Sequence, residues 1–142
     1  MSQQPLPDET TPAEAPQTFY ERVGGHGTFV RLVHAFYVGV ADDAPLRDLY
    51  PEEDLGPAEE RLRGFLEQYF GGPTTYSQQR GHPRLRMRHV PYKVTPAQRD
   101  RWLQHMNAAI DTITDRLSPM DEHQMRAYMA NAAHSMVNSL ED

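Results

Sequence analysis

The most constraining feature of this sequence is the spacing of its apolar residues, which follows the period of an α-helix in four long segments. The first of these segments starts at Thr28, and the others follow Pro57, Pro96 and Pro119. In the first segment the apolar positions are Phe29, Val33, Phe36, Tyr37 and Val40. Residues at this spacing share one face of a helix. Because no segment alternates apolar and polar residues for long enough to form a strand, we predict an all-α fold.

Capping patterns mark where several helices begin and end. Thr18 with Glu21, and Thr95 with Gln98, have the spacing of a capping box. Ser118 directly precedes a proline, as Thr95 does, and is expected to cap the last helix. Gly24-Gly25 and Gly71-Gly72-Pro73 are expected to end the helices before them. Two connections are also predicted, a short turn over residues 46–50 and a polar loop over residues 74–80.

The stripe that follows Pro57 predicts which residues of that helix are buried. Its apolar positions are Ala58, Leu62, Phe65, Leu66 and Tyr69, whereas Glu59, Glu60, Arg61 and Arg63 are expected to face water.

Length and composition indicate one globular domain behind a tail. Residues 1–17 contain no aromatic residue, three acidic residues and the prolines Pro5, Pro7, Pro12 and Pro16. Such a segment buries too little apolar surface to order itself, so we predict a disordered tail over residues 1–17 and one domain over residues 18–142. We expect a cytoplasmic protein, because there is no apolar run of the ~20 residues that cross a bilayer and no signal-peptide pattern.

Charge and cysteine content exclude several classes of function. The net charge is −6, which argues against general binding to nucleic acid or to anionic membranes. The chain has no cysteine, so disulfides, thiolate ligands and cysteine nucleophiles are absent. Any metal must therefore be held by histidine or carboxylate side chains.

Residues 81–91 form a basic segment within this acidic chain. No Asp or Glu occurs between Glu67 and Asp100, while the segment holds three arginines and two histidines. Pro83 and Pro91 are expected to bound a short helix, with His89 in its last turn. This composition fits an anionic ligand, either haem with its propionates or a phosphate group. It also fits a solvated basic helix with a partly buried histidine, and the segment alone does not decide between them.

Three aromatic residues with polar tips add to the case for a buried ligand. Tyr37 and Trp102 lie on apolar stripes, and Tyr50 lies at the predicted hinge before Pro51. A buried hydroxyl or indole N–H needs a hydrogen-bond partner, which a polar ligand would supply. Each residue taken singly is more typical of ordinary core packing.

Together these motifs resemble the truncated haemoglobins, and specifically the second, O-type group of bacterial globins. The resemblance spans about residues 18–140, and its most specific part is the run from Gly81 to His89. The other matching positions are Phe19-Tyr20, Val23-Gly24-Gly25, Phe36-Tyr37, Leu49-Tyr50-Pro51, Phe65-Leu66, Gln68-Tyr69, Gly71-Gly72-Pro73, Tyr76, Trp102 and Ala132-Ala133-His134-Ser135.

This resemblance implies a two-over-two helical sandwich around one haem b, with a penta-coordinate iron bound by His89. It implies that Tyr37, Tyr50 and Trp102 face the open side of the iron, where they would stabilise a bound ligand. Ala58 would lie at the distal gate. The remaining candidates for contact with the haem or its propionates are Leu62, Phe65, Tyr76, His82, Leu85 and Arg86.

The function expected from the resemblance is binding of dioxygen, carbon monoxide, nitric oxide or peroxide. Several hydrogen-bond donors would hold dioxygen tightly, which favours redox chemistry such as peroxide or nitric oxide detoxification over bulk oxygen transport. Because the sequence has no Gly-rich nucleotide-binding fingerprint, turnover would require a separate reductase. The alternative is a non-catalytic all-α module that docks an anionic ligand or partner through its basic segment. Whether the chain forms a homo-oligomer is left open.

Overall fold

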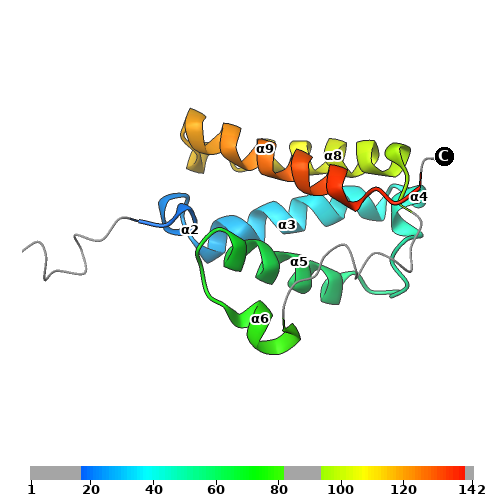
Figure 1. The fold of residues 1–142 in the computed structure, drawn as a ribbon, viewed down its shortest axis with the longest axis horizontal. Helices are drawn as coiled ribbons and strands as arrows, with labels where there is room; N and C mark the ends of the chain where they lie inside the picture. Colours follow the sequence, from blue (N-terminus) through cyan, green and yellow to red (C-terminus); the bar gives the residue numbers. More distant parts are fainter. Residues whose placement is uncertain (1–16, 82–93, 140–142) are drawn as a thin grey trace, which may run out of the picture.

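The computed structural model describes residues 17–81 and 94–139, and every regular element within these ranges is helical (Figure 1). The all-α prediction is therefore confirmed for this part of the chain. The predicted helix in residues 83–90 and nearly all of the predicted N-terminal tail lie outside the described residues. In chain order the elements are α2 (Phe19–Arg22), α3 (His26–Ala41), α4 (Ala44–Arg47), α5 (Gly56–Tyr69), α6 (Thr75–Arg80), α8 (Pro96–Asp111), the short 3-10 helix η2 (Thr114–Arg116) and α9 (Pro119–Met136).

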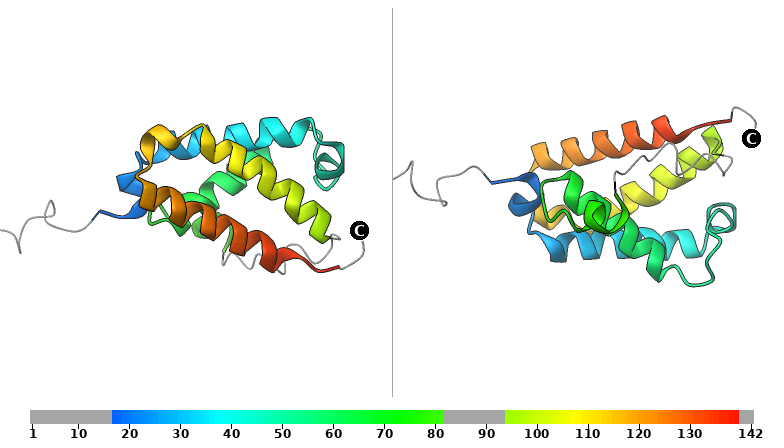
Figure 2. Two further views of the ribbon diagram at one scale, coloured as in Figure 1. Left: turned by 90° about the horizontal axis from the view of Figure 1, so that it is seen from above. Right: turned by 60° about the horizontal axis from the view of Figure 1, so that its bottom comes forward.

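Four long helices form two stacked pairs. Helices α8 and α9 pack together in one layer, and α3 packs against α5 in the other (Figure 1). Contacts between α3 and α8 join the two layers, and the turned views in Figure 2 show the same four helices crossing one another. The short helices α2, α4 and α6 lie around this central arrangement. None of the described helices is long and apolar enough to cross a membrane.

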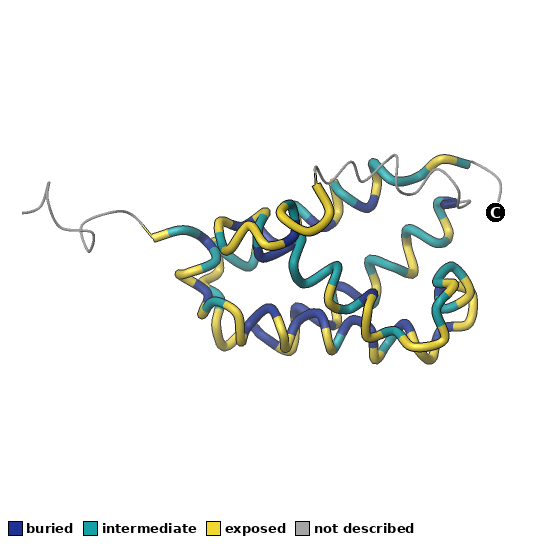
Figure 3. The backbone as a smooth tube through the Cα atoms, turned by 90° about the horizontal axis from the view of Figure 1, so that it is seen from below, coloured by how far each residue is buried: buried dark blue, intermediate teal, exposed yellow. Residues whose placement is uncertain are grey.

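The apolar core follows the stripes predicted from the sequence. Helix α3 supplies much of it, and its buried positions alternate with exposed ones at the helical period (Figure 3). Fully buried side chains from the other long helices complete the core, including Leu66, Met106, Ile110 and Met125. Burial of this apolar surface is the main term that holds the four helices together, at roughly 25 cal/mol for each Å² removed from water.

The predicted helix caps are confirmed by their hydrogen bonds. The Glu21 N–H donates to the Thr18 hydroxyl and the Thr18 N–H donates to the Glu21 carboxylate, both at 3.1 Å. Thr95 and Gln98 form the same reciprocal pair at the start of α8. The Ser118 hydroxyl accepts from the Asp121 N–H at 3.0 Å at the start of α9. Two predicted bounds differ. Helix α3 begins at His26, two residues before the predicted start at Thr28, and helix α4 (Ala44–Arg47) takes the place of the first part of the turn predicted over residues 46–50.

The prediction of a loop over residues 74–80 is wrong, because residues 75–80 form helix α6. Six residues are too short to show a helical period, and contacts with α5 stabilise this helix instead. The Ser77 N–H donates to the Gln68 side chain at 2.9 Å. Tyr76 is buried and packs edge-on against Phe65, with ring centroids 5.5 Å apart.

One member of the predicted α5 stripe is also misplaced. Tyr69 is 53% exposed at the C-terminal end of the helix, so it does not belong to the core. Its ring packs on that of Tyr128 instead, with centroids 4.0 Å apart.

Candidate ligand-binding cavity

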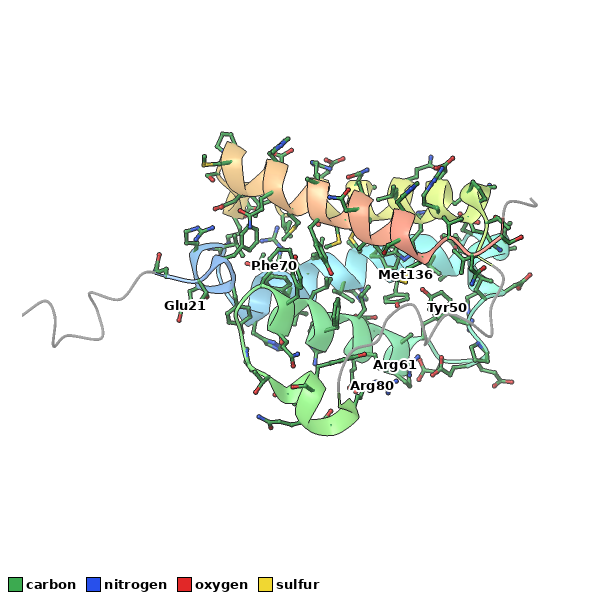
Figure 4. All side chains as sticks on the ribbon, viewed as in Figure 1. Glu21, Tyr50, Arg61, Phe70, Arg80 and Met136 are labelled. Carbon is green, nitrogen blue, oxygen red and sulfur yellow. The ribbon has the colours of Figure 1, made fainter. Side chains whose placement is uncertain are left out.

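The two layers and the α4–α5 connection line a cavity of about 470 Å³ that is partly open to the surface. Four of its lining residues, Tyr50, Arg61, Arg80 and Met136, are labelled in Figure 4 and come from well-separated parts of the chain. Most of the wall is apolar and consists of Leu46, Leu49, Ala58, Leu62, Phe65, Leu66, Val94, Met129, Ala132, Ala133 and Met136. A largely apolar cavity of this size with a few polar groups is typical of a site for a small organic molecule or cofactor.

The structure brings together the three polar-tipped aromatic residues singled out in the sequence. Tyr37 comes from α3, Tyr50 from the segment after α4, and Trp102 from α8, and all three line the cavity. The Tyr37 and Tyr50 rings meet edge to face, with centroids 5.6 Å apart. Phe36 packs against both Tyr37 and Trp102, at 4.9 and 5.1 Å between centroids. One aromatic cluster therefore fixes all three side chains.

The polar atoms of this cluster leave donors for a ligand. The Tyr37 and Tyr50 hydroxyls share a hydrogen bond. That bond uses one of the two O–H groups as donor, so the other O–H remains free to donate elsewhere. The Trp102 indole N–H makes no hydrogen bond to any residue within 17–81 or 94–139. The cluster can therefore offer an indole N–H and one phenol O–H to a molecule in the cavity.

Burial keeps these phenols protonated. Removal from water raises the pKa of Tyr37 far above its ordinary value, and the neighbouring Tyr50 raises it further. Burial also raises the pKa of Tyr50, although the hydrogen bond with Tyr37 and the nearby Arg61 act in the opposite direction. Both tyrosines are therefore neutral hydrogen-bonding groups at physiological pH.

The prediction that Arg61 faces water is wrong, because its side chain is only partly exposed and lines the cavity. Two of its nitrogens bind the Glu52 carboxylate at 2.8 and 3.2 Å. The Arg47 guanidinium holds the same segment by donating to the carbonyls of Tyr50, Glu52 and Glu53 at 2.6–3.2 Å. These bonds fix the segment that carries Tyr50, and they place a cation beside the two phenols.

The other candidates from the sequence divide into two groups. Ala58, Leu62, Phe65 and Tyr76 all line the cavity, and Ala58 and Tyr76 are buried. The candidates His82, Leu85, Arg86 and His89 lie outside the described residues.

Both flanks of that undescribed segment reach the cavity. Arg80 and Val94 line it, from the two sides of residues 82–93. Val94 is held in place by Asn138, since the Val94 N–H donates to the Asn138 side chain at 2.8 Å and the Val94 carbonyl accepts from the Asn138 N–H at 2.9 Å. The described residues on both sides of the segment that carries His89 therefore include cavity-lining ones.

Part of the cavity wall was not identified from the sequence. Tyr128, Met129, Ala132, Ala133 and Met136 form the α9 side of the cavity. The spacing of Met129 and Met136 is equally typical of ordinary core packing, and no pattern in the sequence marks Tyr128 as a cavity residue. Their spacing of three to four residues shows that they share a face, but only the position of α9 shows that this face meets a cavity.

The chemistry of the lining fits haem b better than a bare metal ion. Within residues 17–81 and 94–139 no group of three or more His, Asp or Glu side chains could hold a metal ion. Haem needs only one or two protein ligands to its iron, together with an apolar enclosure for its ring and polar contacts for its propionates. The cavity has the apolar walls, and Arg61 and Arg80 contribute cations to its lining.

Fold and cavity together define an all-helical protein built around an internal site for a prosthetic group. The family described as bacterial-like globin matches residues 18–138. A group 2 truncated hemoglobin of Bacillus subtilis is 38% identical over 94 residues, which are 66% of this chain and 70% of that protein. Another group 2 truncated hemoglobin, from Lotus japonicus, is 40% identical over 98 residues, which are 68% of this chain and 58% of that protein.

Among solved structures, a thermostable hemoglobin from the actinobacterium Thermobifida fusca superposes with a TM-score of 0.85. It is 60% identical, and the match covers 88% of this chain and 100% of that one. The chain belongs to the bacterial-like globin family, and its fold is that of the truncated globins. The cofactor of this family is haem b, at which its members bind diatomic ligands.

Proposed function

We propose that this chain holds one haem b in the cavity through His89 and binds dioxygen and other diatomic ligands at a penta-coordinate iron. The observation that carries the proposal is the convergence of Tyr37, Tyr50 and Trp102 on one apolar cavity from three separate parts of the chain. Dioxygen bound to ferrous haem acquires negative charge on its outer atom, and preorganised donors stabilise such charge strongly in a dry site.

The assignment of His89 rests on its sequence context and on the position of the flanking residues. His89 belongs to the most specific part of the resemblance to O-type globins. Arg80 and Val94, on either side of its segment, both line the cavity. A histidine in this segment is thus close enough along the chain to reach a cofactor there, whereas His26, His34, His123 and His134 belong to exposed positions elsewhere.

Each group of the lining has a separate task in this proposal. The Trp102 N–H and the free O–H of the Tyr37–Tyr50 pair donate hydrogen bonds to the bound ligand. Leu62 and Phe65 exclude water, which strengthens those bonds, and the small Ala58 leaves the approach to the ligand open. If each donor contributes about 1.5 kcal/mol, dissociation of dioxygen slows by about two orders of magnitude.

Slow release favours redox chemistry on bound dioxygen or peroxide over delivery of oxygen along a gradient. We therefore propose peroxide or nitric oxide detoxification with electrons from a separate reductase. The alternative, an all-α module that docks an anion through residues 81–91, receives less support, since most of the cavity wall is apolar and would not attract an anion alone.

Absorption spectra of the purified chain test the proposal. The wild-type protein is expected to take up one haem and to show a Soret band that shifts when the reduced protein is exposed to carbon monoxide. His89→Ala should weaken or alter that band, whereas His123→Ala, at an exposed position on α9, should leave it unchanged. A wild-type chain that stays colourless after hemin is added would refute the haem proposal and favour the anion-docking module.

A further inference from the structure

Two stacked tyrosines connect the cavity with the protein surface. Tyr128, on α9, lines the cavity, and Tyr69, the last residue of α5, is 53% exposed. Their rings are nearly parallel, with centroids 4.0 Å apart and an interplanar angle of 26°. An exposed aromatic residue needs no special explanation by itself. Here, however, its stacking partner belongs to the wall of the ligand site, so the pair forms a continuous aromatic contact from inside to outside.

Neighbouring aromatic rings hold this pair in place. Phe70 meets both rings edge to face, at 5.0 Å from Tyr69 and 5.4 Å from Tyr128. Phe65, which also lines the cavity, lies 6.3 Å from Tyr69 between ring centroids. These contacts fix the orientation of both phenols, so the stacked geometry does not depend on a freely rotating surface side chain.

The two phenols differ in their contact with water, since Tyr69 is exposed and Tyr128 is partly buried. Burial, together with the nearby Tyr69, raises the pKa of Tyr128 to about 12. A tyrosine that loses an electron also releases its phenolic proton, which must pass to an acceptor. Water can take that proton from the exposed Tyr69, whereas the partly buried Tyr128 is less well placed to release one. When an electron is drawn from this pair into the cavity, the tyrosyl radical that results should therefore form on Tyr69.

We propose that the Tyr69–Tyr128 pair carries electrons from an external phenolic donor to the cavity while hydrogen peroxide is reduced there. This inference rests on the redox chemistry proposed above. Tyr69 loses one electron through Tyr128 and one proton to water, which leaves a neutral tyrosyl radical. A phenol then gives Tyr69 one hydrogen atom and becomes a phenoxyl radical. Two such rounds supply the two electrons that, with two protons, convert one hydrogen peroxide into two water molecules.

Spin trapping followed by peptide mass spectrometry tests the route without measuring turnover. The haem-loaded protein is mixed with hydrogen peroxide and a nitroso spin trap, and the modified residue is identified. The adduct is expected on Tyr69. It should be lost in Tyr69→Phe, which keeps the stacked ring, and reduced in Tyr128→Phe. It should also disappear when excess p-cresol, a small phenolic donor, is present.

Tyr20→Phe is the matched control. Tyr20 is also a partly buried tyrosine stacked on another ring, that of Phe29 at 5.6 Å, but it does not line the cavity. This variant should keep the adduct on Tyr69. Peroxide consumption without any adduct on Tyr69, or with an equal yield of protein radicals in Tyr69→Phe, would overturn the electron route and leave the proposed redox function standing. If the haem-loaded wild type fails to consume peroxide, the electron route fails together with peroxide detoxification, whereas the proposed haem and ligand binding still stand.

Discussion

At the scale of single residues, the most informative group is the trio of Tyr37, Tyr50 and Trp102. Each is an ordinary core aromatic when considered alone, and none would identify a function. Their significance comes from two facts taken together: the phenols already share one hydrogen bond, and all three side chains reach the same cavity. The indole N–H and one O–H are consequently left to interact with whatever occupies the cavity.

Trp102→Phe should speed dissociation of dioxygen about tenfold, because it removes one hydrogen bond of about 1.4 kcal/mol to the ligand. Stopped-flow measurement on the reduced, haem-loaded protein gives the rate directly. Tyr76→Phe is a suitable control, since Tyr76 lines the cavity from α6 rather than from the aromatic cluster. Equally fast dissociation from wild type and Trp102→Phe would show that the indole N–H does not stabilise bound dioxygen.

The burial of Tyr37 predicts how the free energy of unfolding should change at alkaline pH. In the unfolded chain its phenol ionises near the ordinary value of 10.0, whereas burial keeps the folded phenol protonated well above that value. The unfolded state therefore binds fewer protons above pH 10, and the free energy of unfolding falls as pH rises. At about pH 11 this one group should lower the free energy of unfolding by about 1.4 kcal/mol.

Urea denaturation at neutral pH and at about pH 11 measures this effect. Tyr37→Phe has no phenol to ionise, so its loss of stability between the two pH values should be smaller than that of the wild type. An equal loss in both proteins would mean that Tyr37 ionises as readily when folded as when unfolded.

At the scale of elements, Asp43 joins the corner between α3 and α4 to helix α8. Its buried carboxylate accepts hydrogen bonds from the Arg101 Nε at 3.0 and 3.2 Å and from the His105 ring at 2.7 Å. Gly39 makes room for this arrangement, because a Cβ there would lie 2.5 Å from the His105 Nδ1. Arg101 and His105 flank Trp102 along α8, so the cluster also helps to fix that indole relative to the tyrosines.

Asp43→Asn should lower the free energy of unfolding by about 1–2 kcal/mol at neutral pH. The effect is smaller than for a fully buried ion pair, because Arg101 is half exposed and water screens its charge. Burial alone would raise the pKa of Asp43, but hydrogen bonds from Arg101 and His105 outweigh it and hold the pKa below the ordinary 3.8. The stabilisation that the Asp43 carboxylate provides is therefore fully present above the ordinary pKa of 3.8, and it is lost as the pH falls through the lower pKa of the folded state.

Chemical denaturation of both proteins over a pH series tests this element-level prediction. The difference between wild type and Asp43→Asn should be largest near neutral pH and should shrink below about pH 4. Asp48→Asn, at an exposed position just after α4, serves as the control. A difference that stays constant down to acidic pH would show that the charge of Asp43 does not stabilise this corner.

At the scale of the whole molecule, the cavity lies between the two helix layers, so the cofactor should contribute to global stability. A ligand present at about 1,000 times its dissociation constant stabilises the folded state by about 4 kcal/mol, which for a domain of this size corresponds to a rise in Tm on the order of 10 °C. Calorimetry of the protein before and after addition of hemin should show this rise, saturating at one haem per chain. An unchanged Tm would indicate that haem does not bind within the fold.

The sequence alone determined the helical class, most helix boundaries and the residues with polar tips that line the site. These features are local, since a helical period or a capping box such as Thr95 with Gln98 is contained within a few consecutive residues. The resemblance likewise depended on short runs, above all the one that ends at His89.

Only the tertiary structure decided which residues meet. Helix α6 forms because Gln68 and Phe65 of α5 contact it, although its own six residues carry no clear period. Arg61 reaches the cavity because Glu52 and the segment held by Arg47 lie beside it. The Tyr69–Tyr128 stack joins two residues that are far apart in the chain, and their contact depends on how α5 and α9 pack. Such contacts follow from the relative placement of whole helices, which no local pattern specifies.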